Sequence, residues 1–537
     1  MAEKNGPSVL KSAGAMGIAV FLSRILGLVR EQVFAAMFGA STATDAYQIA
    51  FRIPNLLRDL FAEGAMSAAL VPTFIRVQKE EGEARGWQVA TRVFGVLFAV
   101  VSVISLVGIL FAEPLVALYA GAFRSVPGKF ELTVSMTRIM MPFFPLVALA
   151  AAFMAILNAA GKFFIPSFAS ALFNVVSILT GVALAGFFEH PIEGMAWGVV
   201  AGGMVQAMIQ WPVLLRVGYR PRWTQPLETP VLSDPALVRM MGLMIPGTVG
   251  LAATQINILV NSIFATSVGE GAVSWLNYSF RLMQFPIGIF GVSLASATLP
   301  AFSRHWSARE PEQAVEVLRK SIRRVFAVNL PASAGLAFLG VPILALIFEH
   351  GRFSSSDTLN TARALAAYSV GLTAYSVVKV LVPVCYAMGE TRIAVISSFF
   401  SVAVNLVANF LLVGSLGFTG LALGTSLTAL LNAGLLWFWI GRRLRVRGIP
   451  VPGSDLLRAG LHCLFASMTM GVTVWALDQF LVAPMNMGNP AWFRALRVAI
   501  GVSTGVIVYT GISILTGIEE TLELLEVFKR RWRRGKR

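Results

Sequence analysis

Apolar residues follow one another along this chain in long runs, which short polar or glycine- and proline-rich connections separate. A run such as VFGVLFAVVSVISLVGILFA, residues 93–112, shows no alternation between apolar and polar positions, so it does not fit the short strands of a membrane β-barrel. A helix needs about 20 apolar residues to cross a bilayer. We count fourteen such runs, with cores at residues 15–38, 43–75, 93–112, 139–157, 166–187, 194–215, 240–266, 274–303, 325–348, 364–387, 393–413, 419–441, 459–477 and 498–516. The pattern predicts an all-α polytopic membrane protein with about 14 transmembrane helices.

The composition supports this fold class. Of the 537 residues, 56% are hydrophobic and 13% are charged, against about 25% charged in a soluble domain. The N-terminal segment has no cleavable signal sequence, so the first run is expected to remain as a span. Cys385 and Cys463 both lie in apolar runs, which predicts buried thiols and excludes a disulfide framework.

The net charge of +16 follows the predicted topology. With both termini in the cytoplasm, the inside connections hold 30 of the 43 Lys and Arg residues, the outside connections hold seven and the spans hold six. This asymmetry is the positive-inside rule, and it argues against nucleic acid as the partner. The tail, residues 517–537, is amphipathic and ends in a basic cluster, which suits the anionic cytoplasmic leaflet or a solvated end that stops translocation.

An internal repeat divides the chain. The segment from Gly194 aligns without a gap with the segment from Gly420, and Arg58 and Arg281 precede a second matching pair. A repeat unit of six spans predicts two six-helix lobes related by an axis along the membrane normal, which suits alternating access around a central cleft. The predicted divisions are 1–223 for the N-lobe, 224–445 for the C-lobe, 446–516 for two appended spans and 517–537 for the tail.

Charged residues inside the predicted spans give the first indication of function. The basic residues are Arg24, Arg30, Arg52, Arg58, Arg281 and Lys379, and the acidic residues are Glu31, Asp45, Asp59 and Glu63. Each base would cost about 2.5–3.5 kcal/mol at the bilayer centre, and the set facing lipid would cost more than about 10 kcal/mol. They must therefore face water or partners. The excess of arginine favours an anionic ligand, since the planar guanidinium suits phosphate oxygens.

An alternative is that these arginines only hold helices together through ion pairs, with Glu31 available to Arg30, and Asp59 and Glu63 available to Arg58. Arg24 and Arg30 flank Gly27 and lie about 120° apart on a regular helix. A helix break at Gly27 would bring both to one cavity. Pro54 lies between Arg52 and Arg58 and would direct them separately.

Other polar residues in the spans carry less information. Asn405 and Asn409 share a helix face, with Thr425 on the next span, so the three could ligate a small cation; we favour hydrogen bonding between helices. The four histidines form no cluster, and no metal-ligand spacing is present. The sequence contains no Walker motif, His-Glu-x-x-His or Gly-x-Ser-x-Gly, which argues against an ATPase or a hydrolase.

Four segments of the chain resemble the MurJ (MviN) lipid II flippases of bacteria. They are SRILGLVRE, FGASTATDAYQIAFRIPNLLRDLFAEGAMSAALVPTF, SFRLMQFPIGIFGVSLASATLP and EHGRFSSSDTLNTARALAAYSVGL. The resemblance covers essentially the whole chain. It implies the MOP exporter fold, like that of MATE transporters: two six-helix lobes in a V around a central cationic cavity, and two C-terminal helices that form a groove for lipid.

The resemblance also implies site residues. Required cavity positions of the family fall on Ser23, Arg24, Arg30, Asp45, Arg58 and Arg281, with Arg52 and Glu63 on neighbouring charged positions. Among these, Arg24, Arg30, Arg58 and Arg281 would bind the diphosphate, and Asp45, Asp59 and Glu63 would hold the arginines. The chain departs from the family at Phe280 and Gln284, where acidic residues often flank the arginine of span 8, and it has no carboxylate beside Asn405 and Asn409.

The implied activity is transport of lipid II, the undecaprenyl-diphosphate-linked disaccharide-pentapeptide, from the cytoplasmic to the periplasmic leaflet for peptidoglycan synthesis. We expect a monomer in the bacterial inner membrane that also contacts membrane lipids and proteins of cell-wall synthesis and division. No cofactor is expected, and coupling to membrane potential, H⁺ or Na⁺ stays open. The alternatives are a flippase for another lipid-linked oligosaccharide or a MATE-like exporter of amphiphiles. A scaffold would not need the arginines, and an enzyme would need an acid/base set that the sequence lacks.

Overall fold

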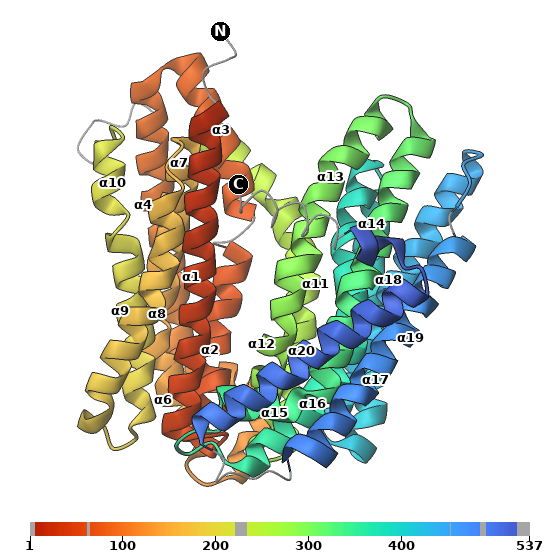
Figure 1. Ribbon diagram of the computed structural model, residues 1–537. Helices are drawn as coiled ribbons and strands as arrows, with labels where there is room; N and C mark the ends of the chain where they lie inside the picture. Colours follow the sequence, from red (N-terminus) through yellow and green to blue (C-terminus); the bar gives the residue numbers. More distant parts are fainter. Residues whose placement is uncertain (1–5, 62–64, 221–233, 452, 484–489, 524–537) are drawn as a thin grey trace. The chain divides into compact units, whose positions relative to one another are not determined.

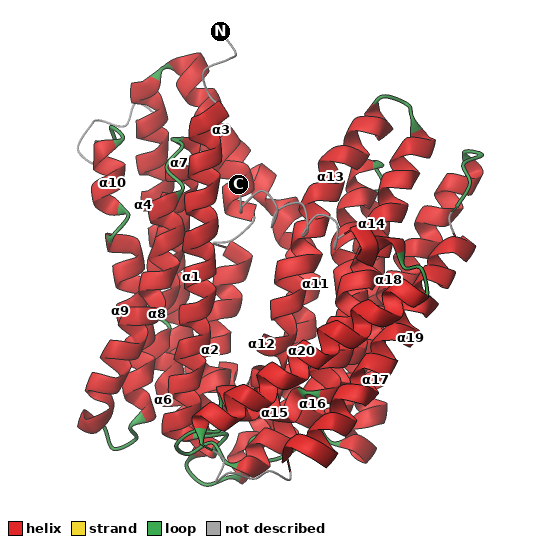
Figure 2. Cartoon of the chain, viewed as in Figure 1, coloured by secondary structure: helices red, strands yellow, loops and turns green. Residues whose placement is uncertain are grey.

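The computed structural model describes residues 6–61, 65–220, 234–451, 453–483 and 490–523, and every element in these ranges is helical (Figure 1 and Figure 2). Contacts divide the chain into unit 1, Met1–Val273, and unit 2, Ser274–Arg537. The helices up to this division are α1 (Gly6–Phe38), α2 (Thr42–Phe61), α3 (Ala65–Glu81), α4 (Glu83–Leu110), α5 (Ala112–Ala120), η1 (Gly121–Ser125), α6 (Lys129–Met140), α7 (Phe143–Ala159), α8 (Phe164–Leu184), η2 (Ala185–Phe187), α9 (Ile192–Met208), α10 (Trp211–Arg216) and α11 (Pro235–Ser267).

The remaining helices begin at the division. They are α12 (Ala272–Pro286), η4 (Ile287–Gly291), α13 (Val292–Ser307), α14 (Pro311–Phe338), α15 (Gly340–Ile347), α16 (Ser355–Ala387), α17 (Thr391–Leu416), α18 (Phe418–Val446), α19 (Gly453–Leu477), η5 (Asp478–Val482) and α20 (Ala491–Leu515). The contact division falls later in the chain than the predicted lobe boundary at 223/224, and the lobe assignment stays a prediction.

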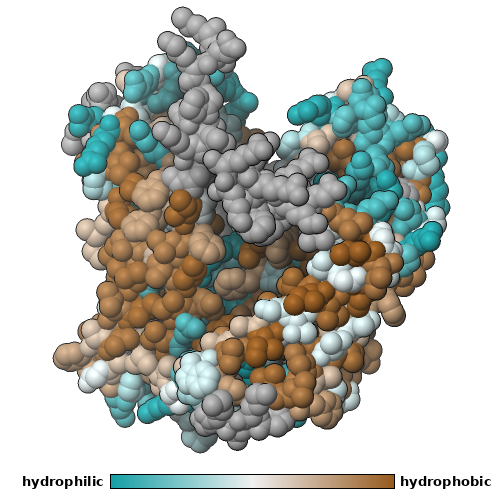
Figure 3. All heavy atoms as spheres, viewed as in Figure 1, coloured by the Kyte–Doolittle hydropathy of each residue, from teal (hydrophilic) through white to brown (hydrophobic). Residues whose placement is uncertain are grey.

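Each of the fourteen predicted apolar cores falls on a helix or on consecutive helices. Among the described residues, ten helices are long and apolar enough to cross a membrane, or eleven when α14 and α15 count as one span bent by 75°. The helix α2 is not apolar enough to be counted, because it contains four charged residues: Asp45, Arg52, Arg58 and Asp59. The fold class is confirmed as all-helical and membrane-spanning, while the count of fourteen spans stays a prediction. On unit 1, Figure 3 shows an apolar band over α8 and α9 with hydrophilic residues at both ends.

Among the described residues, two apolar cores hold unit 1 together. The first joins α3, α4, α7 and α10 around aromatic side chains, with ring centroids 4.9 Å apart for Phe94 and Phe153 and 5.6 Å apart for Trp211 and Tyr219. The second joins α1, α2 and α6 to α9 and includes Phe173. Because this second core surrounds the charged parts of α1 and α2, it sets the positions of the predicted site residues.

The described residues of unit 2 also form two cores. One is formed by α13, α14, α16 and α18 around Phe302, Leu381 and Leu436. The other packs α19 and α20 on α14, where the Tyr509 hydroxyl donates to the Ala327 carbonyl at 2.8 Å. A pocket of about 730 Å³ borders α19 on the side of α14, α16 and α18, and the described residues that line it are almost all apolar and include none of α20. The predicted lipid groove of residues 446–516 stays a prediction.

The repeated glycines have the same packing role in each unit. A β-carbon at Gly194 of α9 would lie 2.7 Å from the Ala185 nitrogen, next to α8. A β-carbon at Gly420 of α18, the position that aligns with Gly194, would lie 2.5 Å from the Leu412 carbonyl oxygen on α17. In both places the missing side chain lets two neighbouring helices approach closely. The repeat seen in the sequence therefore corresponds to a matching helix contact in each unit.

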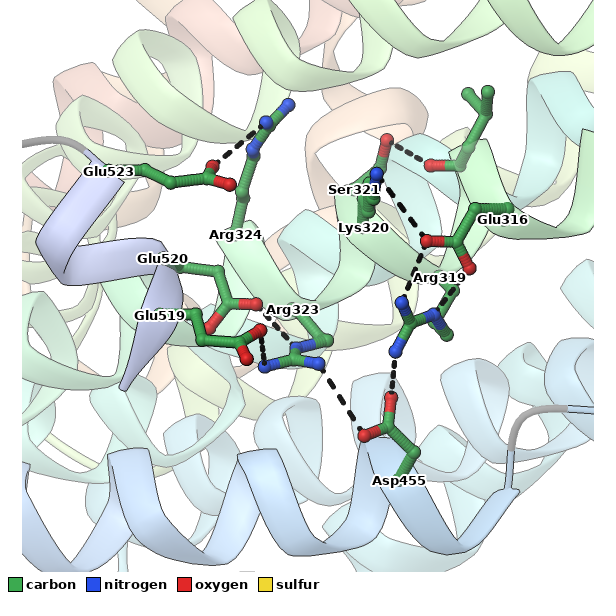
Figure 4. Close-up of polar contacts among 11 residues, drawn as sticks. Glu316, Arg319, Lys320, Ser321, Arg323, Arg324, Asp455, Glu519, Glu520 and Glu523 are labelled. Carbon is green, nitrogen blue, oxygen red and sulfur yellow. Dashed lines mark hydrogen bonds and ion pairs between the residues drawn. The ribbon is translucent and has the colours of Figure 1, made fainter. Parts of the chain in front are cut away.

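Two connections between helices are shorter than the gaps between the predicted apolar cores, at residues 304–324 and 349–363. The predicted 304–324 connection is mostly helix, because α14 already begins at Pro311, and the predicted 349–363 connection ends where α16 begins at Ser355. Charged residues of α14 pair with neighbouring segments (Figure 4): Arg319 contacts Asp455 at 2.6 Å, Arg323 contacts Glu519 at 3.1 Å and also Glu520, and Arg324 contacts Glu523 at 3.1 Å. Hydropathy alone could not show a charged helix stabilised by distant acids.

A buried carboxylate fixes the start of α11. Asp234 caps this helix by accepting from the Ala236 N–H at 3.0 Å, and it also accepts hydrogen bonds from Arg85 at 3.0 Å and from Arg92. Burial raises the pKa of Asp234, but the hydrogen bonds from Arg92 and Ala236 and the charge of Arg85 outweigh burial and hold the pKa below its ordinary value. This carboxylate therefore joins α4 and the start of α11 through charge.

We predict that Asp234→Asn lowers the stability of unit 1 by roughly 3 kcal/mol at pH 7, because Arg92 stays buried without its counter-charge. The depressed pKa means that the wild-type advantage is present above the unfolded pKa of about 3.9 and is lost as the pH falls through the lower folded value. Apparent melting temperatures of the wild type and the variant, taken in detergent at several pH values, measure this difference in stability. Glu113→Gln, at an exposed ion pair with Arg124, is the control. A difference that closes between pH 8 and pH 5 would contradict the account.

Candidate substrate-binding site

Arg30 of α1 is buried, at 8% exposed. Its guanidinium contacts the neighbouring carboxylate of Glu31 at 3.1 Å and lies 5.9 Å from the ring centre of Phe51 and 5.5 Å from that of Phe173. An adjacent carboxylate and two aromatic faces together stabilise a cation in an apolar setting. The ion pair of Arg30 with Glu31 that the sequence suggested is therefore present.

Arg24 differs from Arg30, because its side chain is exposed. The helix α1 runs without interruption from Gly6 to Phe38, so it has no break at Gly27 that would bring the two arginines together. Gly27 instead faces α8, where the Asn174 amide donates to the carbonyl of Ser23 at 3.4 Å. The structure therefore presents Arg24 at the surface of unit 1 and holds Arg30 inside it.

The two arginines of α2 each have a contact that reaches the helix α11. Nη1 of Arg52 donates to the Ser262 hydroxyl at 2.7 Å. Arg58 donates to Oδ1 of Asp59 through Nε at 3.2 Å and through Nη2 at 2.8 Å. The other carboxylate oxygen of Asp59 accepts from the Gln255 amide at 3.3 Å. Asp59 pairs with Arg58, as expected. The sequence did not point to Ser262 or Gln255, because a single polar residue in an apolar run carries little information.

Asp45 of α2 pairs with a lysine of α6. Its carboxylate is fully buried and contacts Nζ of Lys129 at 3.0 Å, and it accepts from the Gly271 N–H at 2.8 Å. Lys129 lies between two predicted apolar runs, in a connection expected outside the membrane, whereas the structure buries it, at 2% exposed, at the start of α6. Asp45 therefore ties α2 to α6 and to the connection after α11. Its expected role of holding the arginines stays a prediction.

Glu270, in the same connection, supports this junction. Its carboxylate accepts from the hydroxyl of Thr42 at 2.6 Å and from the backbone N–H of Thr42 at 2.9 Å. These two hydrogen bonds lower the pKa of Glu270, so the carboxylate stays ionised at neutral pH. Two acids thus fix the first turn of α2.

Arg281 belongs to unit 2 and lies half-buried on α12. The ring of its neighbour Phe280 packs edge-on against Tyr368 of α16 at 5.5 Å, and Gln284 is exposed. The positions where relatives often have acids therefore hold a packing residue and an exposed amide. Lys379 of α16 is exposed, and Glu63 lies outside the described residues.

Asn405 and Asn409 of α17 and Thr425 of α18 form hydrogen bonds within their own helices, and the expected bonding between the helices stays a prediction. The Asn409 amide donates to the side-chain oxygen of Asn405 at 3.0 Å, and the Thr425 hydroxyl donates to the Leu421 carbonyl at 2.8 Å. Within the described ranges, no group of three His, Cys, Asp or Glu residues could hold a metal ion. These contacts favour a structural role, and the cation site at these residues stays a prediction.

Comparison with known proteins identifies the family of this chain. The family model described as "Lipid II flippase MurJ" matches residues 34–490. The chain is 34% identical over 520 residues to the "Probable lipid II flippase MurJ" of Vibrio cholerae, covering 95% of this chain and 96% of that protein. It is 34% identical over 461 residues to the "Lipid II flippase MurJ" of Burkholderia cenocepacia, covering 86% and 88%. This chain belongs to the MurJ family of lipid II flippases.

Solved structures agree with the fold of this family. "Lipid II flippase MurJ, inward closed conformation" matches with a TM-score of 0.75 and 24% identity, covering 93% of this chain and 98% of that chain. A multidrug resistance MATE transporter of the MOP superfamily matches with a TM-score of 0.67 and 16% identity, covering 79% and 95%. The expected MOP fold is therefore confirmed. As a member of the MurJ family with many apolar helices, the protein is an integral membrane protein of the bacterial inner membrane.

We predict different outcomes for alanine at the two arginines of α1. Arg30→Ala leaves the buried Glu31 without this partner and leaves space between two rings, so it should cost about 3–5 kcal/mol and reduce the amount of protein in the membrane. Arg24→Ala should leave abundance unchanged, because that side chain is exposed. Quantitative immunoblots of membranes and melting temperatures in detergent measure both. Equal abundance of the two variants would show that Arg30 is not needed for packing.

Proposed function

We propose that this protein moves lipid II, an undecaprenyl-diphosphate-linked disaccharide-pentapeptide, from the cytoplasmic to the periplasmic leaflet for peptidoglycan biosynthesis. The observation that carries the proposal is membership of the MurJ family along almost the entire chain. The reaction makes and breaks no covalent bond. The protein is thus a transporter, and its residues act by binding and releasing the substrate.

Arginines supply the charge for this transport. Arg24, Arg30 and Arg58 of unit 1 and Arg281 of unit 2 are proposed to bind the diphosphate, whose oxygens match the guanidinium fork. The carboxylate of Asp59 is 2.8 Å from Arg58, and that of Glu31 is 3.1 Å from Arg30. These acids reduce the net positive charge, so the arginines bind an anion without holding it too tightly to release. The prenyl chain stays in lipid while the polar head crosses.

Alternating access is the transport mode that suits this proposal. A carrier binds on one side, closes, and opens to the other side, and it transports only when its ligand binds both states with moderate affinity. The energy source would be the membrane potential, H⁺ or Na⁺. We also propose that the protein acts as a monomer and contacts membrane lipids and proteins of cell-wall synthesis and division.

A second candidate is export of small amphiphiles, which the match to a MATE transporter favours. Export of cationic amphiphiles would need an excess of acidic residues in the binding site, whereas six of the ten charged residues inside the predicted spans are basic. A flippase for another lipid-linked oligosaccharide would share the diphosphate and differ only in the head group. Binding experiments with defined lipids separate these functions.

We predict that the purified protein retains undecaprenyl diphosphate in preference to undecaprenyl monophosphate, because the second phosphate adds charge that guanidinium groups can bind. Native mass spectrometry measures retention. Arg24→Ala and Arg281→Ala should each lower diphosphate retention about tenfold, the effect of losing one or two charge-assisted hydrogen bonds. The same variants should accumulate in the membrane but fail to support growth of a flippase-depleted bacterium.

The matched control is Arg76→Ala, which removes an exposed arginine paired with Glu80 on α3. This variant should bind and complement like the wild type. Equal retention of monophosphate and diphosphate, or full complementation by abundant Arg24→Ala and Arg281→Ala variants, would refute the proposed role of the arginines. Preference for cationic amphiphiles would favour the exporter.

We further predict that both termini and the connection at residues 308–310 face the cytoplasm, and that the connection at residues 348–354 faces the periplasm. The test uses a variant that lacks the buried Cys385 and Cys463. The exposed residues Ser307 and Ser356 are each replaced by cysteine and labelled with a reagent that cannot cross the membrane. Labelling of both positions from the same side would contradict the predicted fourteen-span topology.

A further inference from the structure

Two polar contacts join α2 to α11 in a regular register. Arg52 and Asp59 are seven residues apart on α2, and Gln255 and Ser262 are seven residues apart on α11. Seven residues make about two turns, so each pair lies on one face of its helix. Arg52 contacts Ser262 at 2.7 Å, and Asp59 contacts Gln255 at 3.3 Å. From the first contact to the second, the residue number rises by seven on α2 and falls by seven on α11. Two antiparallel helices have this register.

These contacts lie in apolar surroundings. Ser262 is fully buried and Gln255 is 6% exposed. Residues of α2 and α11 next to them, among them Leu56, Leu60 and Leu259, line an apolar pocket of about 450 Å³ that Gln255 also borders. A buried hydroxyl and a buried amide are costly in such a place unless they form hydrogen bonds. Packing alone would be served better by apolar residues, so the polar pair calls for another explanation.

The hydrogen bonds give each polar residue a definite orientation. The Ser262 hydroxyl donates to the Ile258 carbonyl at 2.6 Å, so its lone pairs are left to accept from Arg52. The Gln255 amide occupies Oδ2 of Asp59, while Oδ1 accepts from both Nε and Nη2 of Arg58. The carboxylate therefore cannot rotate without losing a bond, and the guanidinium plane of Arg58 is fixed with it.

We propose that Ser262 and Gln255 of α11 are positioning residues for transport: Ser262 orients Arg52, and Gln255 orients Arg58 through Asp59. The inference rests on the proposed function and adds α11 to the elements that prepare the arginines for the diphosphate. The two arginines flank Pro54, which interrupts the hydrogen bonding of α2. A helix weakened there needs an outside support to keep its arginines in one orientation, and α11 provides it at both ends of the interval.

The first test replaces Ser262. Ser262→Ala should lower the lipid II transport rate about tenfold, the effect of one lost hydrogen bond to a charged group. Ser262→Thr keeps a hydroxyl and should restore most of the rate. Ser267→Ala is the matched control, because that exposed hydroxyl on the same helix donates only to Phe264 among the described residues. Membrane abundance and melting temperature should stay at the wild-type level in all three variants.

A double-variant cycle separates positioning from general stability. If Ser262 acts through Arg52, the variant Arg52→Ala with Ser262→Ala should transport no more slowly than Arg52→Ala alone. A merely structural serine would instead add its loss to that of Arg52. Additive losses would overturn the assignment of Ser262.

The second test exchanges the partners of the other contact. Gln255→Glu places two carboxylates together and should reduce transport about tenfold, and Asp59→Asn removes the charge beside Arg58 and should do the same. The combined variant Asp59→Asn with Gln255→Glu restores one amide and one carboxylate in hydrogen-bond contact. It should recover at least half of the lost rate, and a double variant as slow as either single variant would overturn the assignment of Gln255.

Failure of this inference differs from failure of the proposed function. If the α11 variants transport normally while Arg24→Ala and Arg281→Ala fail, then the arginines act without support from α11 and only the inference falls. If all of these variants transport normally and the diphosphate is not preferred, the proposed function falls as well.

Discussion

A charge inside a membrane-spanning helix is stable only with a partner, and this constraint determines how the charged helices of the protein are joined. In water, an unpaired guanidinium is solvated at no cost to the fold, whereas in hydrocarbon it costs several kcal/mol. Arg30 has a carboxylate beside it, and Arg52 has a hydroxyl. Arg58 has a carboxylate, which in turn accepts a hydrogen bond from an amide. Each partner lies on the same helix or on the one packed against it, so charge also specifies which helices are neighbours.

The same constraint explains why the partners are of different kinds. A carboxylate cancels the charge of an arginine, while a hydroxyl only fills one hydrogen-bonding position and leaves the charge in place. The hydrogen bond with Ser262 leaves the charge of Arg52 in place, whereas the carboxylate of Asp59 offsets the charge of Arg58. A carrier for an anionic lipid needs such a graded set, because full neutralisation would prevent binding and no neutralisation would prevent release.

The sequence was sufficient to predict the helical fold, the apolar runs and the family. Hydropathy and the positive-inside pattern depend on the bilayer, which acts on every residue in the same way, so they can be read without a structure. The sequence also predicted Glu31 as the partner of Arg30 and Asp59 as the partner of Arg58, since the two residues of each pair are adjacent. Lys129, the partner of Asp45, is 84 residues away, and no local pattern connects them. Likewise Ser262 and Gln255 become meaningful only when α2 and α11 lie side by side.

The pairing of α14 with the end of the chain has a consequence for biosynthesis. Arg323, whose side chain is 13% exposed, contacts Glu519, which is 196 residues later in the chain, and also Glu520. A ribosome makes α14 long before it makes these acids, so until then the arginines must stay in the lipid headgroup region or beside another acid. Asp455 of α19 arrives first and contacts both Arg319 and Arg323. The arginines of α14 are therefore paired in two steps, and the second step comes only after Glu519, Glu520 and Glu523 have been made.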